Sequence, residues 1–388
     1  MVSAQQLFVH RLSIATSHSL LHLSCLVGIV IFLAGCGSDD SQEIVRFNSE
    51  LEKEVITKLD HISDEAENIW PGYGLPHILP IYIVFNDPII GQQVGYILNP
   101  PANIPEGSLL VDGTFNNLPV YRNDILVDKV KELGIDNRLF SFDLLLEGVT
   151  YFYANHGFQP KNAYLDFKDF DNNNVALFTV HEMFHLFQLE YEKWDISEWK
   201  QDFFGYPLTE EIIALNLLLS DISANAYMDK NGDFLEAYVA IRQRQMEIDP
   251  SSQSLVQSFT LITEMIEGSA RYVEHFAALN SVYPTINIDP THSFKTQLDT
   301  VAHDALLARQ ILVQRIPYHV GAIVIKRLAD EGVEVHTAFK TGVTPYILSR
   351  NLTAKAREDY TATLEQLKTK VDWPAYENRA SELFDLLN

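Results

Sequence analysis

Strand-forming segments are concentrated in the first half of the chain, and helical patterns occupy almost all of the second half. Runs rich in β-branched and aromatic residues, bounded by turn sequences, predict strands at His77–Phe85, Gln93–Leu98 and Gly107–Gly113. Separate blocks of strands and helices predict an α+β fold rather than alternating β–α–β units. We expect one unit with a helix-and-strand lobe over residues 43–170 and a mostly helical lobe over residues 171–388.

Helices are predicted where apolar residues recur every three or four positions. The expected helices are 43–70, 123–133, 142–154, 174–194, 209–228, 234–246, 253–279, 293–309 and 320–330. A short strand is expected at 162–167. Pro317 is expected to break the helix before it, and Gly321 to let the next helix pack closely.

The first 36 residues have the pattern of a secretion signal. They contain one basic residue and no acidic residue, and the apolar run "CLVGIVIFLAGC" stops abruptly before "GSDDSQE". That run is too short for a typical membrane-spanning helix. The sequence Leu33–Cys36 resembles the lipobox of bacterial lipoproteins, which implies a lipid on Cys36 after cleavage. In such proteins, Gly at the position after the cysteine, here Gly37, favours the outer membrane. The alternative to a lipoprotein signal is an ordinary signal peptide or an anchor helix.

Cysteine content and charge restrict the chemistry and the partners. The only two cysteines of the chain, Cys25 and Cys36, fall in the signal segment, so residues 37–388 have neither a disulfide nor a thiolate. A metal site there must use His, Asp or Glu. The chain has 28 basic and 52 acidic residues, a net charge of −24, which repels phosphate backbones. We therefore expect no nucleic-acid partner, and membrane contact through the lipid alone.

The segment "VHEMFH" contains two histidines four residues apart with a glutamate after the first. On a helix, His181 and His185 lie one turn apart on the same face and can supply two ligands of a tetrahedral zinc ion. Glu182 lies about 100° further around the helix, where its carboxylate can reach a water molecule beside the metal. The alternative is a buried helix with two hydrogen-bonded histidines and no metal.

A later segment, "LITEMIEGSARYVEHFAALN", contains the sequence Glu267-Gly268-Ser269-Ala270. This sequence resembles the Glu-Gly-x-Ala segment of gluzincin metallopeptidases. The resemblance implies a zincin-like domain over residues 37–388, zinc ligands His181, His185 and Glu267, and Glu182 as the general base. The separation between the two ligand segments is longer than in the best-known gluzincins, so Glu264 and Glu274 stay open as alternatives to Glu267.

The segment "RIPYHVGAIVIKRLADEG" resembles the Tyr-x-x-Gly helix of many gluzincins. In those enzymes a Tyr or His at the start of the helix stabilises the oxyanion. Tyr318 matches this position and His319 is the alternative, although Tyr318 could equally be an ordinary packing residue.

Together these features predict a lipid-anchored, zinc-dependent peptidase of the bacterial cell envelope. The expected reaction is attack of a Zn²⁺-activated water on a peptide bond of a peptide or protein substrate. The strands "LPIYIVF" and "QVGYIL" are expected to be edge strands along which an extended peptide could lie. Two alternatives are a catalytically inactive zincin-like lipoprotein that serves as a binding or assembly module, and a zinc hydrolase of a non-peptide substrate.

Overall fold

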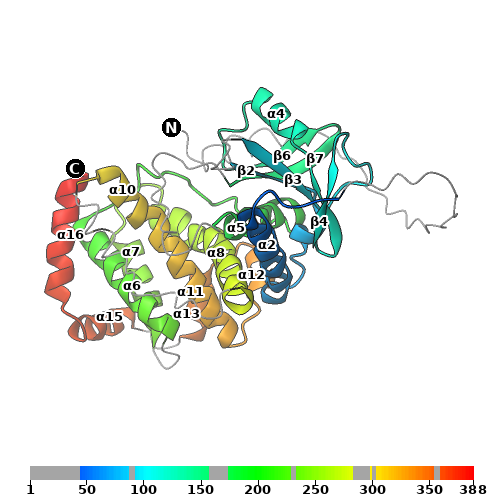
Figure 1. The fold of residues 1–388 in the computed structure, drawn as a ribbon. Coiled ribbons are helices and arrows are strands. Elements are labelled where there is room, and N and C mark those ends of the chain that lie inside the picture. Colours follow the sequence, from blue (N-terminus) through cyan, green and yellow to red (C-terminus); the bar gives the residue numbers. More distant parts are fainter. Residues whose placement is uncertain are drawn as a thin grey trace, which may run out of the picture. The chain divides into compact units, whose positions relative to one another are not determined.

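The structure, a computed structural model, has an α+β architecture (Figure 1). It describes residues 44–86, 92–156, 174–228, 233–282, 298, 303–353 and 359–388. Residues 42–388 form one compact unit. The lipidation candidate Cys36, the expected strand at 162–167 and most of the expected helix 293–309 lie outside the described residues.

Within the described residues, seven strands form one mixed sheet with the order β1-β4-β5-β3-β2-β7-β6. The strands are β1 Ile44–Val45, β2 Ile81–Asn86, β3 Gln93–Leu98, β4 Leu109–Phe115, β5 Leu118–Arg122, β6 Phe140–Leu146 and β7 Val149–Asn155. The pairs β1–β4 and β2–β7 are parallel, and the other neighbours are antiparallel. β6 therefore lies at an edge, and β2 and β3 are central strands.

Three sequence predictions are wrong in this sheet. Ile44 and Val45, expected in the helix 43–70, form β1, and that helix begins only at Glu50. The expected helix 142–154 is instead the antiparallel hairpin of β6 and β7. Its tight turn is formed by Glu147 and Gly148, which both have positive φ angles and so suit a two-residue hairpin loop. The strands expected at an edge, β2 and β3, are covered on both sides, because β7 pairs with β2 and β5 pairs with β3.

Helices make up most of the remaining described chain. They are α2 Glu50–Ile69, α3 Leu75–Ile78, α4 Ile125–Glu132, α5 Asn174–Leu186, α6 Glu210–Met228, α7 Phe234–Glu247, α8 Ile262–Ser281, α10 Ala305–Gln310, α11 Ile316–Asp330, α12 Val335–Lys340, α13 Pro345–Leu352, α15 Tyr360–Thr369 and α16 Trp373–Leu387. Three short π-helical segments adjoin four of them: η3 Phe187–Tyr191 follows α5, η4 Val256–Leu261 precedes α8, and η5 Ile311–Arg315 joins α10 to α11. No helix in the described ranges is long and apolar enough to cross a bilayer.

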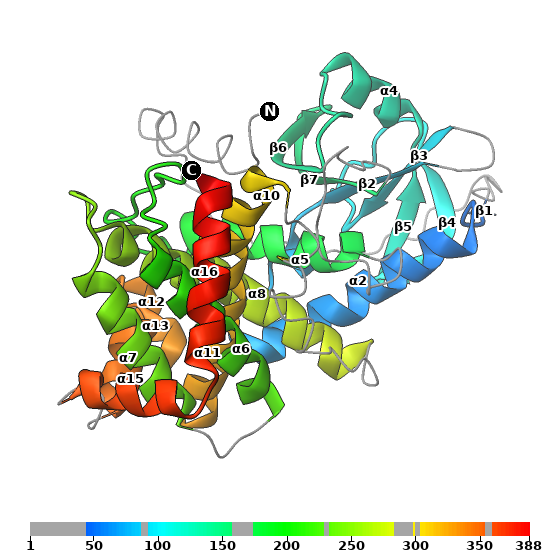
Figure 2. The ribbon, with the colours of Figure 1, turned by 90° about the vertical axis from the view of Figure 1, so that its left-hand side faces the viewer.

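Helices cover both faces of the sheet (Figures 1 and 2). On one face, Leu126, Val127 and Val130 of α4 pack with Tyr82 of β2 and Tyr151 of β7 in a small core. On the other face, α2 and α5 belong to the main core, which continues into the helical part of the chain. The sheet therefore forms one wall behind α5, and α8 lies beside α5 and α2.

α8 and α11 pack closely because both carry a glycine at their contact. A Cβ atom added to Gly268 would lie 2.7 Å from the Cα of Gly321, and one added to Gly321 would lie 2.5 Å from the carbonyl oxygen of Glu264. Neither glycine tolerates a larger side chain without movement of a helix backbone. The predicted close packing at Gly321 is confirmed. Pro317 does not end the preceding helical segment, because η5 runs directly into α11 across this residue.

Candidate metal centre

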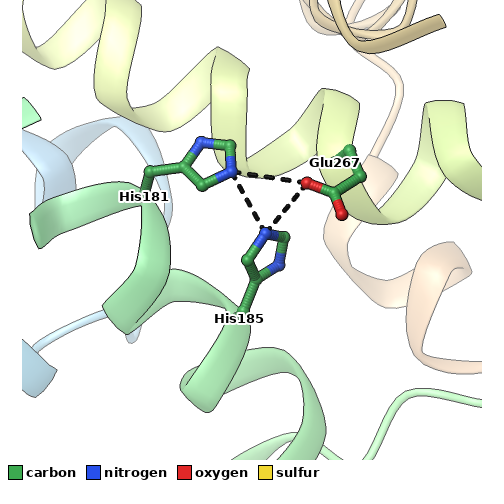
Figure 3. Close-up of side chains that lie close together, drawn as sticks. All are labelled: His181, His185 and Glu267. Atoms are coloured by element: carbon green, nitrogen blue, oxygen red, sulfur yellow. Dashed lines mark hydrogen bonds and ion pairs between the residues drawn. The ribbon is translucent and has the colours of Figure 1, made fainter. Parts of the chain in front are cut away.

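The α5 helix that carries the two histidines is fixed by aromatic packing and by a side-chain hydrogen bond. The Tyr73 hydroxyl donates to the carbonyl oxygen of Val180 over 2.7 Å. The rings of Trp70 and Tyr73 pack edge-on against Phe184 at 5.2 and 4.9 Å. These contacts fix the position of α5, and the histidine side chains project toward α8 (Figure 3).

Three potential metal-binding atoms meet between α5 and α8. His185 Nε2 lies 3.1 Å from His181 Nε2 and 3.0 Å from Glu267 Oε2, and His181 Nε2 lies 3.4 Å from the same carboxylate oxygen (Figure 3). All three side chains are buried, with exposed fractions of 8% for His181, 5% for His185 and 6% for Glu267. Among the described residues, this is the group of His and acidic side chains that could hold a metal ion.

The spacing of these atoms fits a tetrahedral metal ion. Zinc binds imidazole nitrogen and carboxylate oxygen at about 2.0–2.2 Å, so neighbouring ligand atoms of a tetrahedron lie about 3.3 Å apart. The three observed separations of 3.0, 3.1 and 3.4 Å match that value. Small adjustments of side-chain rotamers would let one ion contact all three atoms, and a fourth position would remain for water or substrate.

Gln188 fixes the proton on the outer nitrogen of His185. The Gln188 amide nitrogen donates to the carbonyl oxygen of Ile266 at 2.9 Å and to Ser269 Oγ at 2.7 Å. Since a carbonyl oxygen can only accept, the amide orientation is determined, and Gln188 Oε1 faces His185 Nδ1 at 2.8 Å. Nδ1 is therefore the donor, and the lone pair of a neutral His185 is on Nε2, facing Glu267.

Glu274 has the same effect on the other histidine. Its Oε2 lies 3.0 Å from His181 Nδ1, and its Oε1 accepts from Arg271. Because the carboxylate accepts the Nδ1 proton, the lone pair of a neutral His181 is also on Nε2. A carboxylate or amide oxygen behind each metal-binding histidine is the usual arrangement around metal sites, where it fixes the tautomer and the ring orientation.

The converging atoms are all hydrogen-bond acceptors when both histidines are neutral. Two Nε2 lone pairs and a carboxylate oxygen repel one another at these distances unless a proton or a metal cation lies between them. Burial alone would lower the pKa of His181, but the charge of Glu274 and the hydrogen bonds that His181 donates to Glu267 and Glu274 raise it from 6.5 to about 10. Burial likewise opposes the charged forms of His185 and Glu267, yet their attraction raises the pKa of His185 and holds that of Glu267 far below its usual range.

Metal binding at this site should release protons and weaken in acid. A metal ion must displace the Nε2 proton of His181, whose pKa in the metal-free protein is raised to about 10. At pH values below that pKa, the zinc association constant should increase about tenfold for each unit that the pH is raised, for each proton displaced. Competition with a chelator between pH 6 and pH 8, corrected for protonation of the chelator, measures this slope. A zinc affinity that does not change over this range would contradict the assigned hydrogen-bond network.

Glu182 lies beside the three converging side chains and is half-buried. Burial raises the pKa of its carboxyl from 4.5 to about 7, against the opposing charges of His185 and His181. A carboxyl group with a pKa near 7 can accept and return a proton at neutral pH, as a general base must. It is directed away from the ligand positions because it lies about 100° around the helix from His181.

The two alternative carboxylates lie elsewhere. Glu264 is buried against α7, where it accepts hydrogen bonds from Arg242 and from the Tyr238 hydroxyl. Glu274 contacts the outer nitrogen of His181 instead of the shared space. Of the three acids considered from the sequence, the structure brings Glu267 alone to both histidines. His275, beside Glu274 in α8, is half-buried, and burial lowers its pKa to about 3.

Tyr318 and His319 lie half-buried in the first turn of α11. Gly321, on the next turn, contacts α8 at Gly268, so the helix that carries Tyr318 packs directly beside the residue that follows Glu267. Burial and the charge of Arg271 lower the pKa of His319 to about 4, which makes His319 neutral near pH 7.

Gln188 was the one member of this arrangement that sequence reasoning did not identify. Its position three residues after His185 places it on the same face of a helix, which is a usable signal for a supporting residue.

Comparison with known protein families, curated proteins and solved structures gives no match for this chain. The function must therefore be argued from the site itself.

Proposed function

We propose that this chain is a zinc-dependent peptidase of the gluzincin type. The observation that carries the proposal is the set of three acceptor atoms, His181 Nε2, His185 Nε2 and Glu267 Oε2, spaced as tetrahedral ligands next to a glutamate of raised pKa. Two imidazoles and one carboxylate form a donor set that suits Zn²⁺ with an open position for catalysis.

The remaining chemistry belongs to side chains of this chain. A bound zinc ion would polarise a water molecule and a substrate carbonyl group. Glu182 accepts the proton of the attacking water and later passes it to the leaving amine. The Tyr318 hydroxyl donates a hydrogen bond to the oxygen that gains negative charge, with His319 as the alternative donor. Glu274 and Gln188 hold the two imidazoles in the orientation that binds the ion.

The arrangement of the sheet supports a zincin-like fold with an extended peptide as the substrate. Phe140, at the start of the edge strand β6, packs on Phe178 of α5 with the ring centroids 5.2 Å apart. Phe178 lies one helical turn before Glu182, so β6 runs past the proposed catalytic residues. A strand at the edge of a sheet can bind an extended peptide chain through its backbone groups.

The signal-like segment supports a location of the proposed enzyme in the bacterial cell envelope. The lipobox-like sequence that ends at Cys36 supports a lipid anchor.

Metal-dependent cleavage of peptides tests this function. We expect the purified protein to bind one zinc ion per chain, measured by mass spectrometry of the metal, and to cleave members of a mixed peptide library. Removal of zinc with a chelator should abolish cleavage, and added zinc should restore it. Bound zinc without cleavage of any peptide would favour the non-catalytic module or a hydrolase of another substrate. Absence of zinc binding would refute the metal site itself.

A further inference from the structure

A cavity of about 410 Å³ lies between the β6–β7 hairpin and the end of the metal-binding helix. Side chains that line it include Leu79, Phe142, Phe152, Leu186, Glu190 and Tyr191. Phe142 and Phe152 contact each other with ring centroids 5.9 Å apart. The cavity is large enough to accept a long side chain of a bound peptide.

The cavity adjoins the proposed catalytic residues. Leu186, one of its walls, directly follows His185 and lies one helical turn after Glu182. Phe142, another wall, belongs to the edge strand β6, whose first residue packs on Phe178 of the same helix. A peptide that lies along β6 with a bond near Glu182 would therefore place one of its side chains at this cavity.

The composition of the cavity favours a long side chain with a positive end. Most lining residues are apolar or aromatic, and Glu190 is the one charged residue among those that the structure describes. Glu190 and Tyr191 are both exposed, so the carboxylate lies at the solvent side of an apolar cavity. The methylene stem of Lys or Arg can pack on such walls while its charge reaches the carboxylate and an aromatic face.

The charge of the whole chain acts in the same direction. A net charge of −24 attracts cationic peptides and repels anionic ones during diffusion to the protein. An acidic side chain would in addition be placed beside Glu190 in a cavity whose described lining has no basic residue. Local and global charge therefore select against Asp and Glu at this position.

We propose that this cavity binds a Lys or Arg side chain of the substrate, and that basic peptides are the substrate class. This inference rests on the proposed peptidase function. Glu190 acts here as a specificity residue, and Leu186, Phe142 and Phe152 form the apolar walls that contact the stem of the bound side chain.

Binding of matched peptides tests the inference without relying on turnover. Acetylated and amidated Ala-Gly hexapeptides, with a single Lys, Leu or Glu placed at each position in turn, are titrated into zinc-loaded Glu182→Gln protein in a calorimeter. At one position we expect Lys to bind at least about tenfold more tightly than Glu, at 0.15 M salt. Glu190→Gln should weaken binding of that Lys peptide about fivefold and leave the Leu peptide unchanged.

Two further variants separate charge from space. Thr150 lines the cavity and is exposed, so Thr150→Trp should fill the cavity. Binding of the peptides with Lys or Leu at the selective position should then weaken to the same extent. Glu198→Gln removes an exposed carboxylate that does not line the cavity, and it should leave all affinities unchanged. No Lys preference at any position, or a preference that survives Glu190→Gln, would overturn the inference.

Peptide cleavage by the unsubstituted protein shows whether the cavity assignment alone is wrong or the proposed peptidase function as well. Zinc-dependent cleavage of peptides without any preference for Lys or Arg would overturn the assignment of the cavity alone. A protein that cleaves no peptide in a complete library would overturn the peptidase function, whatever the calorimetry shows for the cavity.

Discussion

Glu182→Gln is expected to reduce kcat for peptide cleavage by roughly 10²- to 10⁴-fold, the usual contribution of a general base. The variant keeps the shape of the side chain but cannot accept a proton from water. Because Glu182 is not among the three converging ligand atoms, zinc content should stay at one ion per chain. Cleavage rates and metal content of the same preparation measure both effects.

The same substitution has a stability consequence that serves as a control for folding. In the metal-free protein the folded state holds the pKa of Glu182 at about 7, above its ordinary value of 4.5. Ionisation of this group therefore opposes folding, increasingly as the pH rises from 4.5 to 7 and fully above 7. Metal-free Glu182→Gln should thus unfold at the same or a higher temperature than the unsubstituted protein at pH 8. Full activity in a stable Glu182→Gln variant would exclude this residue as the base.

Glu267→Ala is expected to weaken zinc binding by about a thousandfold or more, with loss of activity. Structural zinc ions in zinc-finger peptides have apparent binding free energies of about 10–16 kcal/mol at neutral pH, and this change removes one of three ligands from the site. It also leaves two buried imidazoles without the carboxylate that stabilises their charged forms. Zinc affinity measured by chelator competition at fixed pH reports the loss.

Glu274→Gln is expected to weaken zinc binding less than Glu267→Ala does. The amide oxygen can still accept the Nδ1 proton of His181, but the negative charge behind the ring is lost. Loss of such a supporting group weakens metal affinity by about 10- to 100-fold. Glu198→Gln, on the surface, should change neither zinc affinity nor activity. A larger loss of zinc affinity in Glu274→Gln than in Glu267→Ala would mean that Glu274 is the metal ligand and Glu267 the supporting residue.

The pairing of His181 and His185 could be predicted from a local pattern, whereas Glu267 was expected only from the resemblance of its segment to gluzincins. The i, i+4 spacing of His181 and His185 places both rings on one helix face whatever the rest of the chain does. The small residue Gly268 after Glu267 indicates a helix that packs closely, although the structure uses it for contact with α11 at Gly321. The partner of each outer nitrogen depends on where α8 lies relative to α5, which no local pattern specifies.

The sheet was harder to predict because its order depends on long-range pairing. The apolar residues of 142–154 fit the period of a strand and also that of a helix, and the turn at Glu147 and Gly148 is the feature that divides this segment into a hairpin. β7 is the strand that pairs with β2, so a prediction that lacks β7 leaves β2 at an edge of the sheet, a place that β6 occupies in the structure.

Anomalous X-ray diffraction at the zinc absorption edge, from crystals of the zinc-loaded protein, tests the central claim most directly. We predict a single strong peak about 2.0–2.2 Å from His181 Nε2, His185 Nε2 and one oxygen of Glu267. A peak held by other residues, or no peak between α5 and α8 in protein shown to be saturated with zinc, would contradict the metal centre and the hydrolase built on it.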